Sequence, residues 1–309
     1  MSLRKVIPAP VLPYWRAYRQ RRSATVAVKR AFYSADGPPI LVYQMGKVGS
    51  TTVCRSLEAV NLGHRVLHVH FLSHDLPAKR KRYIRSIKYP PAIHYDVSFA
   101  VRKELATGQT RRLKIITLVR DPISRLVSSL YEVPELMDAD VKTDSGTIDP
   151  VKSIEFLERR LAEPGGLEYE YTWFDKELKS VFGIDVFADP FPKEQGWRTI
   201  NDNEVEVLMM RLEDLSRVGP RVIADFLDLQ GPLDLISGRV RSHSVSGASY
   251  ADVRQSLSIS RHVTEQVYGS EFVRHFYSDD MIDEFMDRWQ SPNRSPFRGN
   301  SDENYYDSP

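Results

Sequence analysis

The chain has 309 residues, of which 41% are hydrophobic and 27% charged, a composition typical of a globular protein with one large or two modest domains. The formal net charge of +2 is too small to indicate nucleic-acid binding, and the one cysteine, Cys54, excludes an internal disulfide and a cysteine-rich metal site. No apolar run approaches the roughly 18–20 residues of a membrane-spanning helix, so we expect a cytoplasmic protein.

The N-terminal segment, residues 1–36, is basic and has no acidic residue before Asp36. It contains no unbroken apolar stretch, so it is a poor signal peptide. We expect a solvated, loosely ordered arm. The alternative is peripheral attachment of this arm to an anionic membrane surface or to an anionic polymer.

Short apolar segments then predict four strands. They are residues 38–45 (PPILVYQM), 64–71 (HRVLHVHF), 92–99 (AIHYDVSF) and 113–120 (LKIITLVR), of which the last is the clearest.

Two helices are predicted directly after strands. Residues 50–61 have Ser50 or Thr51 as a candidate N-cap, and residues 121–133 begin with Asp121 as N-cap and a proline in the first turn. The basic segment 77–90 is a helix or a loop. Strands that alternate with helices predict an α/β fold, with a parallel sheet flanked by helices as in P-loop proteins.

The second half of the chain changes in character. Residues 134–200 mix helical patterns with aromatic, proline and glycine residues, which indicates an insertion or lid packed on the sheet. Residues 204–215 predict a further strand that passes into a helix over 213–229. We therefore expect one domain over 37–290, followed by a disordered tail at 291–309.

The segment YQMGKVGSTT, residues 43–52, joins the first strand to its helix. Backbone N–H groups and the positive end of a helix dipole meet in such a loop and favour an anion. Gly46 and Gly49 permit a tight turn, and Lys47 adds a mobile positive charge. The loop also supplies hydroxyl donors, namely Ser50, Thr51 and Thr52.

The order of residues in this loop differs from that of a nucleotide-triphosphate loop, because no second glycine precedes a Lys-Ser/Thr pair. In that motif the hydroxyl after the lysine holds Mg²⁺. A sulfuryl group carries one formal negative charge, where a terminal phosphoryl group carries about two. The loop therefore suits transfer of a sulfuryl group without a metal.

A second anion-binding signal is LVRDPISRLVSSLY, at the end of the clearest strand. Arg120 lies at the carboxyl end of this strand, where open α/β sheets bind ligands. Ser128 follows eight residues later, about two helical turns on. A guanidinium and a hydroxyl suit a phosphate monoester.

Together these motifs resemble those of sulfotransferases that use 3′-phosphoadenosine 5′-phosphosulfate (PAPS). QMGKVGSTT resembles their 5′-phosphosulfate loop and RDPISRLVSS their 3′-phosphate motif, in forms closer to glycan than to small-molecule sulfotransferases. The resemblance covers about residues 38–131. Residues 173–197 are also similar to bacterial, sulfotransferase-like proteins assigned to capsular polysaccharide synthesis.

The resemblance implies roles for individual residues. Lys47 would contact the bridging oxygen and the 5′-phosphate, and Arg120 and Ser128 would hold the 3′-phosphate. The 5′-phosphosulfate would be held by Gly49, Ser50, Thr51 and Thr52. A late loop would add a further contact to the nucleotide, for which the sequence offers Arg241, Ser242 and Ser246. No metal is implied.

Transfer to a hydroxyl also needs a general base. In the glycan enzymes that this chain resembles, a histidine or a glutamate has this role. The candidates here are His70, then His94, then Asp96, whereas His68 is interpreted as a core residue of an alternating strand.

The leading hypothesis is a PAPS-dependent sulfotransferase that acts on a hydroxyl of a carbohydrate or glycoconjugate. Two alternatives remain open: a P-loop kinase or NTPase, and a nucleotide-binding protein without catalytic activity that serves in polysaccharide assembly. The basic residues 78–88 either guide an anionic polymer or form a solvated face.

Overall fold

The computed structural model describes residues 12–86, 93–108, 112–202, 204–237, 253–254 and 256–290. Their centre is a five-stranded sheet in the order β2-β1-β3-β5-β4. Strands β2, β1, β3 and β5 are parallel to one another, and β4 pairs with β5 in the antiparallel direction at one edge. The strands are β1 Ile40–Tyr43, β2 Val66–Val69, β3 Leu113–Val119, β4 Trp197–Asp202 and β5 Val205–Arg211.

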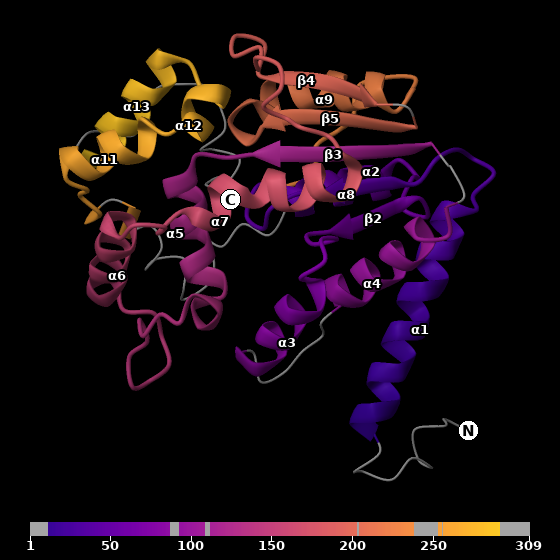
Figure 1. Cartoon of the computed structure of the whole chain (residues 1–309), viewed down its shortest axis with the longest axis horizontal. Helices are drawn as coiled ribbons and strands as arrows, with labels where there is room; N and C mark the ends of the chain where they lie inside the picture. Colours follow the sequence, from indigo (N-terminus) through magenta and orange to yellow (C-terminus); the bar gives the residue numbers. More distant parts are fainter. Residues whose placement is uncertain are drawn as a thin grey trace.

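Helices flank this sheet and extend beyond it (Figure 1). The helices of the first half are α1 Leu12–Phe32, α2 Ser50–Ala59, α3 Leu76–Ser86, α4 Ile93–Leu105 and α5 Pro122–Glu132. Those of the second half are α6 Pro150–Ala162, α7 Glu168–Phe174, α8 Ser180–Phe182, α9 Leu215–Phe226, α11 Arg261–Tyr268, α12 Glu271–Phe276 and α13 Asp279–Gln290. Three short elements complete the fold: the 3₁₀ turns Pro134–Met137 and Leu212–Asp214, and the π-helical turn Asp175–Lys179.

The predicted α/β class is confirmed. Every residue of β1 and of β3 is buried, as expected for central strands covered by helices on both faces. Figure 1 shows the carboxyl end of β3 pointing toward α5, with α6 and the C-terminal helices nearby. Loops that follow β1 and β3 therefore meet at one end of the sheet.

The prediction of a strand over 92–99 is wrong, because residues from Ile93 onward form α4. The apolar residues of this segment alternate, which is typical of a strand. In the structure Tyr95, Ser98 and Val101 are buried at a spacing of three residues, and the helix packs between α1 and β2.

Residues 12–32, which we expected to belong to a loosely ordered arm, form the long helix α1. Its buried residues are Ala24, Val28, Ala31 and Phe32, which lie on one face at helical spacing and pack toward α4. The basic segment 77–90 is helical as far as Ser86. Within the described ranges, no helix is both long and apolar enough to cross a bilayer.

The segment 134–200 contributes to both the core and the sheet, because its last residues, 197–200, belong to β4 and are not an insertion packed on the sheet. Trp173 and Phe174 of α7 are buried in the main core, and the ring of Trp173 lies 5.2 Å from that of Tyr43 in β1. This contact joins the second half of the chain to the strand that precedes the glycine-rich loop. The predicted tail, 291–309, lies outside the described residues.

Candidate functional site

The loop between β1 and α2 has the backbone geometry of an anion-binding turn. Lys47 has a φ of 72° and Gly49 a φ of 90°, so two residues of the loop are left-handed. Gly49 is the N-cap of α2, and no side chain caps this helix, so the predicted cap by Ser50 or Thr51 is wrong. A helix N-terminus without a side-chain cap favours an incoming anion.

The helix that follows β3 begins differently. The carboxylate of Asp121 accepts hydrogen bonds from the backbone N–H groups of Ile123 and Ser124, so the predicted N-cap is confirmed. This N-terminus already has a bound negative charge. Of the two helix N-termini at this end of the sheet, that of α2 therefore favours an anion and that of α5 disfavours one.

The two sequence motifs are in direct contact. Nη1 of Arg120, just after β3, donates to the backbone carbonyl of Lys47 at 3.0 Å. The Lys47 ammonium forms an ion pair with Glu132, at the end of α5. Lys47 is one-quarter exposed and Glu132 nearly half exposed, so their pairing is accessible to solvent and to a competing anion.

Arg125 of α5 holds the glycine-rich loop through a backbone carbonyl. Its Nε donates to the Glu170 carboxylate at 2.9 Å, and its Nη1 donates to the carbonyl of Gly46 at 3.3 Å and to Ser129 at 3.1 Å. The Arg125 and Glu170 side chains are both buried. One buried ion pair thus joins the loop, α5 and α7.

The hydroxyl groups predicted to hold the donor lie in two helices. Ser50 and Thr52 are buried in the first turn of α2, while Thr51 is exposed. Ser128 is buried in α5, two turns after Arg120. The predicted late contacts Arg241 and Ser246 lie outside the described residues.

Three histidines form a cluster beside the glycine-rich loop between β1 and α2. His68 and His70 lie on β2 and at its end, and His94 lies at the start of α4. The ring centroids are 4.5 Å apart for His68 and His70, 4.7 Å for His68 and His94, and 5.3 Å for His70 and His94. His68, interpreted from the sequence as a core residue, therefore belongs with the two candidate bases.

Burial keeps the imidazoles of His68 and His70 neutral. Desolvation lowers the pKa of His68 to about 2 and that of His70 to about 4, with a further decrease from neighbouring imidazoles, and it also lowers the pKa of His94. Glu132 opposes this decrease for His70 and His94. Nδ1 of His70 lies 2.8 Å from the carbonyl of Gln44, which can only accept, so Nδ1 carries the proton and Nε2 has the free lone pair.

Asp96, the third candidate base, is engaged elsewhere. Its buried carboxylate accepts from Gln20 of α1 at 2.8 Å and from Arg80 of α3 at 3.3 Å, and it lies 3.8 Å from Arg21. These contacts join α1, α3 and α4. They indicate a structural role for Asp96, and the two histidines remain the stronger candidates.

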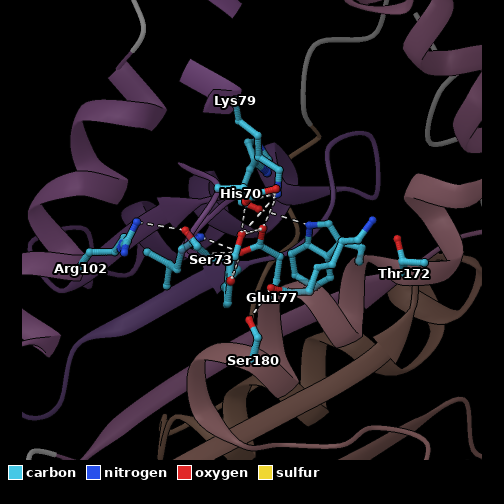
Figure 2. Close-up of polar contacts among 12 residues, drawn as sticks. His70, Ser73, Lys79, Arg102, Thr172, Glu177 and Ser180 are labelled. Atoms are coloured by element: carbon cyan, nitrogen blue, oxygen red, sulfur yellow. Dashed lines mark hydrogen bonds and ion pairs between the residues drawn. The ribbon is translucent and has the colours of Figure 1, made fainter. Parts of the chain in front are cut away.

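A second buried carboxylate, Glu177, holds the loop that follows β2. Figure 2 shows Glu177 at the centre of this network, with Lys79 and Ser73 pointing toward it. It accepts from the Tyr43 hydroxyl at 2.6 Å, from the Ser73 hydroxyl at 2.6 Å and from Lys79 at 2.7 Å. The backbone N–H groups of Leu72 and Ser73 also donate to it.

Glu177 lies in the π-helical turn Asp175–Lys179, an irregularity often found at functional sites. In the preceding helix, the indole N–H of Trp173 donates to the carbonyl of His70 at 3.3 Å (Figure 2). Residues 173–177 therefore fix the backbone that carries His70.

The C-terminal helices are anchored to the second motif. The hydroxyl of Tyr268 in α11 donates to Asp121 at 2.9 Å, and the indole of Trp289 in α13 donates to it at 3.3 Å. Glu213 accepts from the backbone N–H of Asp121 at 2.8 Å and from Tyr277 at 3.2 Å. Burial raises the pKa of Glu213 to about 7, and the nearby Asp121 charge adds to this increase.

Sequence reasoning gave no role to Arg125, Glu132, Glu170, Glu177 or Glu213. Two of them had a local signal, because Arg125 lies inside the RDPISRLVSS motif and Glu177 inside the segment 173–197. The other three glutamates lie in helical or turn segments with no distinguishing pattern, and all four meet the site only through contacts distant in sequence.

One comparison with known proteins gave a match. The NKWYS family model, described as "Putative capsular polysaccharide synthesis protein", matches residues 147–278, less than half of the chain. No curated protein and no solved structure matches. The matched region contains Glu170, Trp173 and Glu177, which support the site, whereas Lys47 and Arg120 lie outside it.

Proposed function

We propose that this protein transfers a sulfuryl group from PAPS to a hydroxyl of a carbohydrate or glycoconjugate. The observation that carries the proposal is the direct contact of the two anion-binding motifs, through the hydrogen bond from Arg120 to the Lys47 carbonyl. PAPS carries two anionic groups at opposite ends of one adenosine. Two positively charged residues, Lys47 after β1 and Arg120 after the adjacent parallel strand β3, suit such a ligand.

In this proposal the 5′-phosphosulfate binds at the uncapped N-terminus of α2, and the 3′-phosphate binds Arg120 and Ser128. Lys47 leaves Glu132 for the bridging oxygen of the donor, because the anion carries the greater negative charge. The backbone N–H groups after Gly49 and the hydroxyls of Ser50 and Thr52 hold the remaining oxygens. These donor contacts need no metal.

The reaction then requires one proton transfer and one sulfuryl transfer. Nε2 of His70 takes the proton of the acceptor hydroxyl, whose oxygen forms a bond to sulfur. The bond from sulfur to the bridging oxygen breaks, and 3′-phosphoadenosine 5′-phosphate leaves with that oxygen. Lys47 stabilises the charge that develops there. The negative charge of the bound donor raises the low pKa of His70 and so favours its protonated form.

The acceptor class is inferred from the family match. A description that refers to capsular polysaccharide synthesis favours a bacterial glycan or its precursor as acceptor. A hollow beside α3 and α4 has a basic and apolar lining that suits an anionic sugar chain. Its lining residues are Pro77, Arg80, Lys81, Ile84, Arg85 and Phe99.

Transfer of radiolabelled sulfate from PAPS to a panel of unsulfated bacterial polysaccharides tests the proposal. We expect label in polymer with the wild type, a loss of at least about 100-fold with Lys47→Ala, and little change with Lys103→Ala, an exposed lysine of α4. Binding of the nucleotide without transfer to any acceptor would instead favour a nucleotide-binding protein without catalytic activity. Transfer of phosphate from ATP with Mg²⁺ would favour a kinase.

A further inference from the structure

The three-histidine cluster has the composition of a metal site. Two of its members, His68 and His70, are two residues apart and so project from the same face of the β2 segment. His94 reaches them from the start of α4. One ring nitrogen from each residue lies within 4.8 Å of the others.

The hydrogen bonds leave nitrogen lone pairs available within this cluster. Nδ1 of His70 is held by the carbonyl of Gln44, so its Nε2 is free to act as a ligand. Metal-binding histidines are commonly oriented in this way, with the second ring nitrogen bonded to a carbonyl or a carboxylate. The backbone of His70 is also held, through its carbonyl, by Trp173.

His68 provides an independent observation. Its Nε2 is buried, and in the part of the chain that the structure describes it has no hydrogen-bond partner. A buried polar atom without a partner destabilises a fold, and such atoms are rare in folded proteins. A cation bound by this nitrogen would remove that destabilisation.

We propose that His68, His70 and His94 form a binding site for a divalent transition-metal ion of the zinc type. Three imidazoles leave one position of a tetrahedral ion open for water or another ligand. Nitrogen ligands favour Zn²⁺ and Co²⁺ over Mg²⁺ and Ca²⁺, which prefer oxygen.

The cluster needs only a small rearrangement to bind such an ion. Tetrahedral ligands at about 2.0–2.1 Å from zinc lie roughly 3.4 Å from one another. The largest separation in the cluster, up to 4.8 Å, must therefore decrease by about 1.4 Å. His94 is exposed and begins its helix, so rotation of its side chain can supply this movement.

This inference is independent of the proposed donor. The metal ligands lie beside the loop that would bind PAPS and include none of its residues, and Gln44, three residues before Lys47, joins the two. A bound ion would use the Nε2 lone pair of His70, so His70 can act as general base only when no ion is bound. The two states are mutually exclusive.

Metal titration of the full chain, purified without a polyhistidine tag and stripped with a chelator, tests the site. Calorimetry with ZnCl₂ and absorption spectroscopy with CoCl₂ are suitable measurements. We expect one ion per chain, with the intense visible absorption of four-coordinate Co²⁺ and an increase in melting temperature on binding. MgCl₂ should produce neither effect.

Substitutions then locate the site. His70→Ala and His94→Ala should each weaken Zn²⁺ binding at least about tenfold, while His74→Ala, an exposed histidine outside the cluster, should not. His94 is exposed, so its variant serves if substitution of His68 or His70 prevents folding. No binding of Zn²⁺ or Co²⁺ to the wild type, or equal affinity in His94→Ala and wild type, would overturn the proposal. Nucleotide binding would be unaffected by either outcome.

Discussion

Two glycines of the loop after β1 should respond differently to the same substitution. A Cβ atom at Gly49 would lie 2.7 Å from Cδ1 of Leu212, and the φ of 90° is unfavourable for alanine. A Cβ atom at Gly46 would have no atom within 4 Å, and its φ is not left-handed. Gly49→Ala is therefore expected to destabilise the fold, and Gly46→Ala is not.

The magnitude follows from these two costs. Left-handed backbone costs alanine about 1–2 kcal/mol, and the overlap with Leu212 adds about 1 kcal/mol, because the end of a leucine side chain can partly move aside. For a chain of 309 residues, a loss of about 2–3 kcal/mol lowers the melting temperature by about 3–5 °C. Gly46→Ala should change the free energy of unfolding by less than about 1 kcal/mol.

Calorimetric melting of both variants, with titration of 3′-phosphoadenosine 5′-phosphate, separates folding from binding. If the nucleotide also approaches the backbone at Gly46, Gly46→Ala weakens nucleotide binding at an unchanged melting temperature. Equal melting temperatures for the two variants would show that the left-handed backbone and the contact with Leu212 do not constrain Gly49. Full nucleotide affinity in Gly46→Ala would refute the close approach at that residue.

Three further predictions concern the groups around the loop. Glu170→Gln leaves Arg125 buried without its charge partner, and it should lower the free energy of unfolding by about 3–5 kcal/mol in urea denaturation. The double variant Glu170→Gln with Arg125→Met should lose less free energy of unfolding than the sum of the two single variants. Arg120→Ala should weaken 3′-phosphoadenosine 5′-phosphate about 10–100-fold and adenosine 5′-phosphosulfate little, and equal weakening would contradict its role. The pKa of Glu213 is raised from 4.5 to about 7, so its protonated form is favoured in the folded state, and the free energy of unfolding decreases as the pH rises from 4.5 to 7. Glutamine does not titrate, so the free energy of unfolding of Glu213→Gln should increase relative to that of the wild type by up to about 3 kcal/mol between pH 5 and pH 8. A difference between the two proteins that stays constant from pH 5 to pH 8 would contradict the shift.

The parts of the site that could be predicted are those that depend on short stretches of consecutive residues. A buried strand followed by glycines, a lysine and hydroxyl residues predicts the loop at 43–52, and Asp121-Pro122 after an apolar strand predicts the start of α5. Parallel pairing of these strands then places both loops at one end of the sheet. The hydrogen bond from Arg120 to Lys47 agrees with that expectation.

The parts that could not be predicted depend on contacts between distant residues. Glu132 meets Lys47 across 85 positions, and Glu177 meets Ser73 across 104. No local pattern identifies the distant partner of either glutamate. The alternating apolar residues of segment 92–99 predict a strand, but from Ile93 onward the segment is helical because it packs against α1. His68 likewise acquires its significance only when α4 brings His94 beside it.

Binding of the nucleotide by the two motifs is measured by calorimetric titration of 3′-phosphoadenosine 5′-phosphate into the full chain in the presence of a chelator. We expect binding that is unchanged by the chelator and greatly weakened by Lys47→Ala and by Arg120→Ala. Binding that requires Mg²⁺, or no binding at all, would contradict this expectation.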